Sequence, residues 1–223
     1  MIKFDMLYDQ APEYFNFMKD TFSLCKDKTV LELGAFEGRF SNLILQNTPT
    51  SLTVVEPNDT NPGYNTELRE LVDFHACTLN DYYNHTKKKV DVVIACGLFY
   101  HLHSPLHALE LILNHSDPDI IIMDSPEIND LLNMSLGATD TPLAFKYRKE
   151  EVLQPGGSQP DNGITKPISI SVSNPYATIK LLLKEHFGYS EECVFLPTLG
   201  FDLPVSKERS LLSIFRKGIW LSD

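Results

Sequence analysis

Short apolar runs alternate with segments of helical spacing over the first half of the chain. The apolar runs fall at residues 29–34, 51–56, 72–76, 90–95 and 119–123, and the helical segments between them include 39–46 and 105–114. Strands of this length that alternate with helices are typical of a parallel sheet with crossover helices. The first, fourth and fifth runs lack polar alternation, as expected for strands that helices cover on both faces. The pattern therefore predicts an α/β fold with helices on both sides of a mostly parallel sheet.

An N-terminal helix is expected before this alternating region. Pro12 opens residues 12–24, in which apolar side chains recur at helical intervals. Two interpretations are open for residues 1–27: the helix packs on the sheet in the ordinary way, or its aromatic side chains form a lid over a bound ligand. The aromatic residues concerned are Tyr8, Tyr14, Phe15 and Phe17.

The pattern changes after Asp124. Residues 125–174 contain clusters of Pro, Gly, Ser and Asn without a clean period, which is typical of a functional or disordered insertion. Within it, Lys146–Glu151 (KYRKEE) is interpreted as the solvated charged face of a helix, with a cationic patch for an anionic molecule as the alternative. The helix–strand pattern then returns at 175–187, 193–196 and 211–215. We expect a single domain over residues 1–223, with 125–174 inserted on the substrate side.

Charge and composition limit the classes of function. Thirty acidic and nineteen basic residues give the 223-residue chain a net charge of −11, which disfavours binding duplex nucleic acid through the overall field. The four cysteines are scattered and form no C-x-x-C pair, as expected for reduced thiols. No apolar run is long enough to span a bilayer, and the N-terminus lacks the apolar core of a secretory signal. We therefore expect a cytoplasmic protein without membrane partners and leave its oligomeric state open.

The most informative stretch is Val30–Ser41 (VLELGAFEGRFS), in which a strand leads through a glycine-bearing turn into a helix. In such an arrangement a ligand lies against the backbone at the carboxyl edge of the sheet. Gly34 permits the tight turn, and Gly38 permits close approach at the start of the helix. The dinucleotide pattern G-x-G-x-x-G is not met, because Phe36 takes the place of its middle glycine and a pyrophosphate would meet Glu37.

Two acids favour a ligand that carries a positive centre and an ammonium group. Glu32 precedes Gly34 by two residues and is placed to accept a hydrogen bond from an ammonium group, directly or through water. Glu56 ends the second strand, 22 residues after Gly34, and an acid at about this distance binds both ribose hydroxyls of an adenosine-type cofactor. On one predicted β-α-β unit, the two acids together indicate a nucleoside cofactor.

Over about residues 28–125, the chain resembles the class I S-adenosylmethionine-dependent methyltransferases. VLELGAFEGRFS is similar to their first motif, and LTVVEPN (Leu52–Asn58) is similar to the second. VDVVIACGLFYHLHSPLHALELI (Val90–Ile112) is similar to the fourth-strand motif of a subgroup with the pattern G-x-L-Y-H-L-x-x-P. The resemblance implies a Rossmann-like sheet of seven strands in the order 3-2-1-4-5-7-6, with strand seven antiparallel and helices on both faces.

The resemblance also implies which residues bind S-adenosylmethionine. The methionine end would be lined by Glu32, Gly34, Ala35 and Gly38; the ribose by Glu56, Pro57 and Asn58; the adenine side by Thr78 or Leu79; and the end of the fourth strand by Cys96 and Gly97. Members of the family often have an acid near the adenine, whereas this chain has Thr78 or Leu79 there, with Asp81 close behind.

The segment Phe99–Ser104 (FYHLHS) is expected in front of the transferred methyl group, because it follows the fourth strand. A general base is needed only when the acceptor must lose a proton, and histidine is suited to that role near neutral pH. His101 is therefore the candidate base, and Tyr100 is the candidate for orienting the acceptor. The structural alternative is that His101 caps the following helix or packs against the sheet.

A metal site is not expected. His101, His103 and His107 do not have the spacing of a helical ligand pair, and no cysteine nearby completes a set. In the alternative with a divalent ion at this edge, Asp124 at the end of the fifth strand would supply a carboxylate.

These patterns predict an S-adenosylmethionine-dependent methyltransferase that acts on a small-molecule acceptor, an anionic one if Lys146–Glu151 forms a cationic patch. One alternative is a tRNA-modifying methyl- or carboxymethyltransferase, which the net charge disfavours. The other is a non-catalytic subunit that binds S-adenosylmethionine. An NAD-dependent oxidoreductase is disfavoured because the loop lacks a third spaced glycine and carries Glu37.

Overall fold

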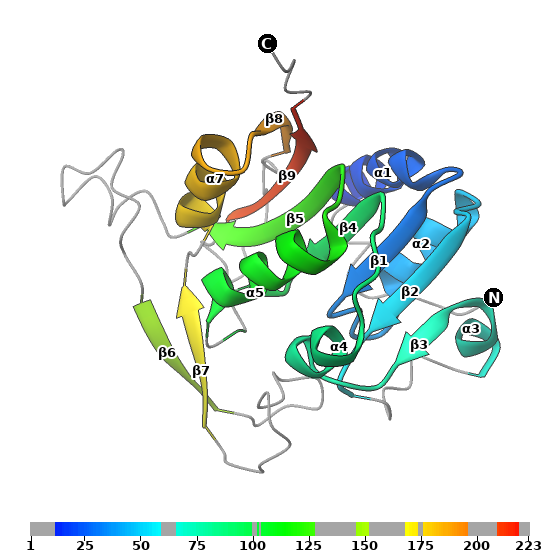
Figure 1. The fold of residues 1–223 in the computed structure, drawn as a ribbon, viewed down its shortest axis with the longest axis horizontal. Coiled ribbons are helices and arrows are strands. Elements are labelled where there is room, and N and C mark those ends of the chain that lie inside the picture. Colours follow the sequence, from blue (N-terminus) through cyan, green and yellow to red (C-terminus); the bar gives the residue numbers. More distant parts are fainter. Residues whose placement is uncertain are drawn as a thin grey trace.

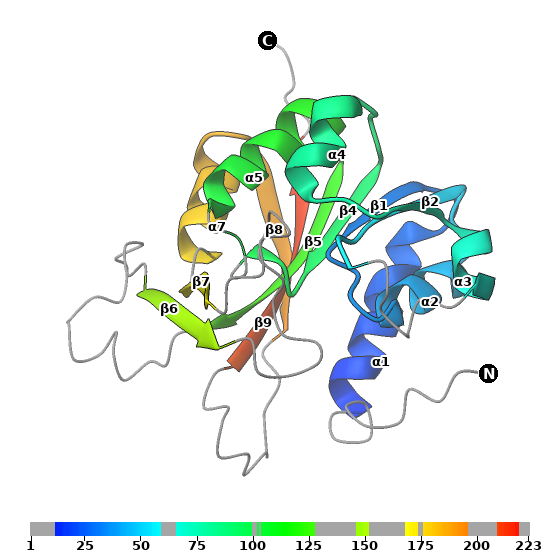
Figure 2. The same cartoon turned by 90° about the horizontal axis from the view of Figure 1, so that it is seen from below.

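In the computed structural model, seven strands form one mixed sheet with helices on both faces (Figures 1 and 2). The structure describes residues 12–58, 66–99, 102, 104–127, 146–151, 168–173, 176–195 and 209–218. The strands of the sheet are β1 (Thr29–Leu33), β2 (Ser51–Val55), β3 (Asp73–His75), β4 (Val92–Cys96), β5 (Ile120–Glu127), β8 (Tyr189–Phe195) and β9 (Arg209–Lys217).

The strand order is β3-β2-β1-β4-β5-β9-β8. The pairs among β1 to β5 are parallel, and β9 runs antiparallel to both of its neighbours. The predicted order 3-2-1-4-5-7-6 is therefore confirmed, with β8 as the sixth and β9 as the seventh strand of this sheet. Because β1 to β5 are parallel, their carboxyl ends meet at one edge, which Figure 1 shows as the edge that their arrowheads share.

The helices form two layers. One face carries α1 (Pro12–Thr21), the 3-10 helix η1 (Phe22–Cys25), α2 (Arg39–Gln46) and α3 (Thr66–Leu71). The other carries α4 (Leu79–His85), α5 (Pro105–Leu111) with its π-helical continuation η3 (Ile112–Ser116), and α7 (Tyr176–Glu185). No helix in the described ranges is long and apolar enough to cross a membrane.

Side-chain alternation along β1 divides the core between these layers. Leu31 and Leu33 join the cluster under α4, α5 and α7, whereas Val30 joins the cluster under α1 and α2. Successive side chains of a strand point to opposite faces, so Glu32 lies on the same face as Val30, toward α2. That placement puts an acid where the neighbouring positions are apolar. Phe17 packs against the same cluster, whereas the other three aromatic residues of the proposed N-terminal lid lie outside the described side chains.

Helix α4 is absent from the sequence-based prediction. Its sequence, LNDYYNH, is short and has no apolar period, so the hydrophobic pattern does not reveal it. The local signal is its N-cap: the Thr78 hydroxyl accepts from the Asp81 N–H and donates to the Asp81 carboxylate. Two of its own residues, Tyr82 and Tyr83, are buried, so packing against the core stabilises the helix.

The interpretation of Lys146–Glu151 as a helix face is wrong. These residues form the strand β6, which pairs antiparallel with β7 (Ile168–Ser173) in a separate two-stranded sheet. The alternating sequence of β7, ISISVS, is typical of a strand, and it pairs with β6. The sequence KYRKEE does not by itself indicate this pairing. Figures 1 and 2 show β6 and β7 beyond the main sheet, on the side where β5 ends. The substrate-side role of residues 125–174 stays a prediction.

Candidate functional site

The loop that follows β1 has an unusual backbone. Gly34, Phe36 and Gly38 all adopt positive φ, at 72°, 50° and 73°. Left-handed backbone is ordinary for glycine but strained for a residue as bulky as phenylalanine. Phe36 is also 41% exposed, so packing does not repay that strain. Strain of this kind concentrates at functional sites, which makes this loop the first candidate.

Glu56 holds the loop in place. It follows β2, is 7% exposed, and its Oε2 accepts a hydrogen bond of 2.8 Å from the Phe36 N–H. Its Oε1 accepts one of 3.0 Å from the Asn58 N–H. The Glu56 N–H in turn donates to the His75 carbonyl, at 3.1 Å, so the ends of β2 and β3 are also tied together. One buried carboxylate therefore links the turns that follow β1 and β2.

Glu32 is a buried acid with one oxygen satisfied and one not. It lies in β1, is 2% exposed, and its Oε2 accepts a 2.5 Å hydrogen bond from the Ser41 hydroxyl of α2. Its Oε1 has no hydrogen-bond partner among the described residues. A buried polar oxygen without a partner costs about 1–3 kcal/mol, so a ligand that donates to it gains that much.

The surroundings of Glu32 raise the pKa of its carboxyl group. Burial raises the pKa of the Glu32 carboxyl from its usual 4.5 to about 7, the Ser41 hydrogen bond opposes the rise, and the nearby charge of Glu56 adds to it. The two acids thus lie close enough for their charges to repel each other. That they hold one ligand stays a prediction. Neither points into bulk solvent.

Glu37 does not present a bare negative charge to this site. Its Oε2 accepts hydrogen bonds from Arg39 Nε at 2.9 Å and Arg39 Nη2 at 2.6 Å. This pairing weakens the argument from the sequence that Glu37 repels a pyrophosphate.

The remaining cofactor-binding candidates lie along the same sheet edge. Ala35 and Cys96 are buried, and Pro57 is exposed. Gly97 follows β4 with φ 70°. Thr78 is the N-cap of α4, and Leu79 begins that helix and packs partly against the core. Contact of these residues with a ligand stays a prediction.

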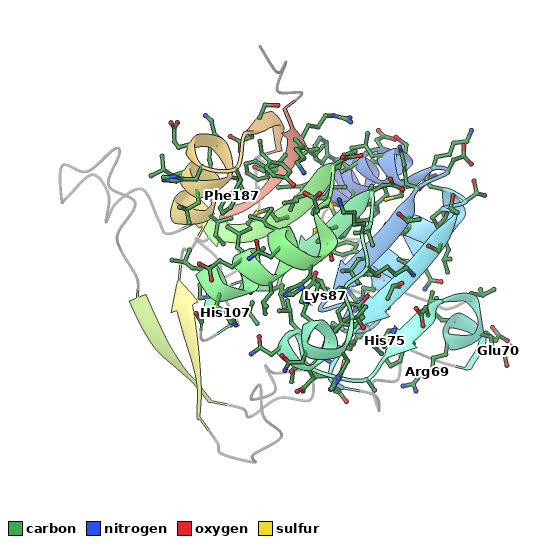
Figure 3. All side chains as sticks on the ribbon, in the orientation of Figure 1. Arg69, Glu70, His75, Lys87, His107 and Phe187 are labelled. Atoms are coloured by element: carbon green, nitrogen blue, oxygen red, sulfur yellow. The ribbon has the colours of Figure 1, made fainter. Side chains whose placement is uncertain are left out.

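The two catalytic candidates, His101 and Tyr100, lie outside the described residues, as does His103. His107 is on α5 with its side chain 53% exposed (Figure 3), and its Nδ1 lies 3.7 Å from Glu110 Oε2. Asp124 is in β5, but its side chain is outside the described set. Within the described part of the chain, no group of three or more potential ligands is placed to hold a metal ion.

Sequence reasoning missed two residues of the site, Ser41 and Leu98. Ser41 is fully buried on the inner side of α2, and its signal was a hydroxyl residue within an otherwise apolar helix face. Leu98, after β4, touches the turn at Gly34: a Cβ added to Gly34 would lie 3.0 Å from Leu98 Cδ1. This contact depends on two distant segments, and no local pattern signals it.

We expect Gly34→Ala to lower the free energy of unfolding by about 1–2 kcal/mol, because alanine resists the left-handed region. The added methyl also crowds Leu98, and the Gly34 N–H must keep its 2.9 Å hydrogen bond to the Val55 carbonyl. Urea unfolding followed by circular dichroism measures the change. Equal midpoints for the variant and the parent protein would contradict the prediction.

Comparison with known families identifies the fold. A model of the methyltransferase domain family matches residues 9–136, more than half of the chain. The chain belongs to the methyltransferase domain family. The match includes β1, the loop that Glu56 holds, α2 and β4, so the site described above lies inside the methyltransferase domain. A search of curated proteins found no match.

Solved structures share the fold of this methyltransferase domain at low sequence identity. The N-methyltransferase NodS from Bradyrhizobium japonicum WM9, in complex with S-adenosylhomocysteine, has a TM-score of 0.61 and 15% identity, over 95% of this chain and 91% of that one. The 1,6-didemethyltoxoflavin-N1-methyltransferase of Burkholderia thailandensis gives 0.60 and 15%, over 95% and 85%. Magnesium protoporphyrin IX methyltransferase from Synechocystis PCC 6803, with bound S-adenosylhomocysteine, gives 0.59 and 12%, over 98% and 90%. At these identities the likeness establishes the class I methyltransferase fold.

Proposed function

We propose that this chain is an S-adenosylmethionine-dependent methyltransferase that acts on a small-molecule acceptor. The observation that carries the proposal is the buried Oε1 of Glu32, which precedes the loop after β1 and accepts no hydrogen bond from the residues that the structure describes. Family membership supports the activity, and structures of the same fold contain S-adenosylhomocysteine. Two of these relatives are named for small-molecule acceptors, a didemethyltoxoflavin and magnesium protoporphyrin IX.

A second buried acid in the same molecule shows what Glu32 lacks. Glu191 in β8 has a side chain 8% exposed, and its Oε1 accepts a 2.7 Å hydrogen bond from the Ser213 hydroxyl. Its Oε2 is paired with the Lys180 ammonium group of α7. Glu32 has the equivalent serine bond, and no ammonium group of the described residues pairs with its other oxygen. The α-ammonium group of S-adenosylmethionine would complete the same arrangement at Glu32.

Glu56 would hold the ribose of the same molecule. A carboxylate offers about four acceptor positions, so accepting the Phe36 and Asn58 N–H groups is compatible with accepting ribose hydroxyls as well. Because these bonds fix the carboxylate on two sides, it requires little reordering when the sugar arrives. The ribose acid and the ammonium acid would together set the position of the nucleoside along the sheet edge.

The bound cofactor supplies an electrophilic methyl group on a sulfonium centre. The contribution of the protein is to hold the acceptor in line with that methyl and to exclude water. His101 would take a proton from an acceptor that must lose one, and Tyr100 would orient it. In this proposal the insertion at 125–174 lies on the acceptor side.

Isothermal titration calorimetry with two nucleosides tests the assignment. S-Adenosylhomocysteine should bind at micromolar concentration or tighter, and 5′-methylthioadenosine should bind about 100-fold more weakly, since it keeps the adenine and ribose but lacks the group that Glu32 pairs with. Equal affinity for the two would show that the amino-acid end is not held at Glu32. No binding of either would overturn the proposed function.

A further inference from the structure

We propose that Ser41 positions Glu32 as a proton-exchanging receptor, so that binding of the cofactor's ammonium group expels a proton stored on this carboxyl. The inference rests on the proposed function, because it takes the ammonium group of S-adenosylmethionine as the ligand of Glu32. It adds a positioning residue to the site and a pH dependence to cofactor binding.

Ser41 is built to fix the direction of Glu32. It is the third residue of α2 and is fully buried, and the 2.5 Å bond to Oε2 joins α2 to β1. With one oxygen anchored to the helix, the carboxyl group is oriented, and Oε1 is the oxygen left for a donor. Ser41 therefore acts on the ligand through Glu32.

Among the described residues, the groups that act on Glu32 supply no positive charge. They are the Cys25 thiol of η1, the Ser41 hydroxyl of α2 and the Glu56 carboxylate that follows β2. Arg39, the cation at the start of α2, donates two hydrogen bonds to Glu37. Burial and the charge of Glu32 raise the pKa of the Cys25 thiol to about 12, so this group stays neutral.

An acid buried among such neighbours is mostly protonated below neutral pH when no ligand is bound. Burial and Glu56 raise the pKa of the Glu32 carboxyl to about 7, and the Ser41 bond holds it below the value that burial alone would produce. A cationic ligand reverses the balance, because an opposite charge at hydrogen-bond distance favours the ionised carboxylate.

The exchange balances in charge and atoms. The neutral carboxyl group and the ammonium group of the ligand become a carboxylate–ammonium pair, and the proton of the carboxyl group passes to solvent. Below about pH 6 each binding event releases close to one proton, at about pH 7 it releases about half a proton, and above about pH 8 it releases almost none. Over the acidic range, the affinity then falls about tenfold for each pH unit.

Calorimetry in buffers of different ionisation enthalpy counts the released protons. The ligands are S-adenosylhomocysteine and its analogue in which hydrogen replaces the α-amino group, each at about pH 6 and about pH 8. We expect release of close to one proton with S-adenosylhomocysteine at the lower pH only. We expect no release with the deaminated analogue at either pH.

Variants of Ser41 separate positioning from simple structural support. Ser41→Ala removes a hydrogen bond that lowers the pKa of Glu32, so proton release should persist to higher pH and the affinity at about pH 8 should fall about tenfold. Ser41→Thr keeps the hydroxyl and should restore the pH profile. The matched control is Ser116→Ala, which removes another buried serine hydroxyl, 2.9 Å from the Tyr83 hydroxyl, near the start of β4.

The outcomes distinguish this inference from the proposed function. If S-adenosylhomocysteine binds with no proton release at about pH 6, or Ser41→Ala leaves the pH profile unchanged, the inference fails and the function stands. The inference also fails if the deaminated analogue releases as many protons, since the proton would then come from elsewhere. If neither ligand binds the folded protein, the proposed function fails and the inference falls with it.

Discussion

Glu32→Gln should weaken S-adenosylhomocysteine binding by about 100-fold. It should also raise the free energy of unfolding of the ligand-free protein at neutral and alkaline pH. A hydrogen bond between charged groups contributes about 1.5–3 kcal/mol, and each 1.4 kcal/mol is a tenfold change in affinity. Glutamine has nearly the same shape and no charge to desolvate. The same replacement therefore removes a binding interaction and a burial cost. Calorimetry measures the first effect, and urea unfolding measures the second.

The sign of the stability effect follows from the raised pKa. Burial moves the pKa of the Glu32 carboxyl from 4.5 to about 7, so between these values the folded protein holds a proton that the unfolded chain has lost. The free energy of unfolding then falls as the pH rises through this window, by about 3 kcal/mol in total. The contribution is fully present below about pH 4.5 and is lost above about pH 7. Glutamine does not titrate, so the variant should lack this part of the pH dependence.

Glu191→Gln is the matched control, because it alters the other buried glutamate that accepts from a serine hydroxyl. Here the replacement removes an ion pair whose Lys180 end is 34% exposed, so the free energy of unfolding should fall by about 1 kcal/mol. The affinity for S-adenosylhomocysteine should not change. If the Glu32 variant instead loses stability in parallel with the Glu191 variant, Glu32 is a structural residue and not a ligand-binding one.

Glu56→Ala should weaken both S-adenosylhomocysteine and 5′-methylthioadenosine by about 1,000-fold. It removes the acceptor for the ribose and also the partner of two backbone N–H groups, those of Phe36 and Asn58. Each lost bond to a charged group costs about 1.5–3 kcal/mol, and the strained loop loses the bond that holds Phe36. Calorimetry with both nucleosides measures the loss.

The pattern across the two ligands separates the roles of the acids. Both nucleosides contain the ribose, so both should suffer from the loss of Glu56, whereas only S-adenosylhomocysteine should suffer from the loss of Glu32. Glu56→Gln keeps one acceptor oxygen and should fall between the alanine variant and the parent protein. A Glu56→Ala variant that binds 5′-methylthioadenosine normally would exclude ribose binding at this residue.

Much of the fold was predictable because it depends on residue-by-residue apolar patterns. The strand TVLEL was found at its observed position as a short apolar run that ends at a glycine, and the helix RFSNLILQ was found from its 3.6-residue period. Helix α4 and strand β6 were not found. Both are short and polar, and each depends on contacts with distant parts of the chain. Helix α4 depends on the packing of Tyr82 and Tyr83 in the core, and β6 depends on its pairing with β7.

The candidate site divides in the same way. Glu32 and Glu56 were identifiable because each lies at or just beyond the carboxyl end of a parallel strand, and such ends meet at one edge. The raised pKa of Glu32 was not identifiable, because it depends on how far the packed elements bury the carboxyl group. Nor was the bond from the Phe36 N–H to Glu56, which exists only when two loops 20 residues apart come together.

The amino-acid sequence alone determined which segments become strands and helices, and which acids come to the carboxyl edge, because chain geometry and strand direction depend on local residue order. Only the tertiary structure decided that Ser41 occupies one oxygen of Glu32 and leaves the other without a partner among the described residues. The reason is physical: burial and charge at one atom are sums over neighbours from η1, α2 and β2, and packing alone brings those elements together.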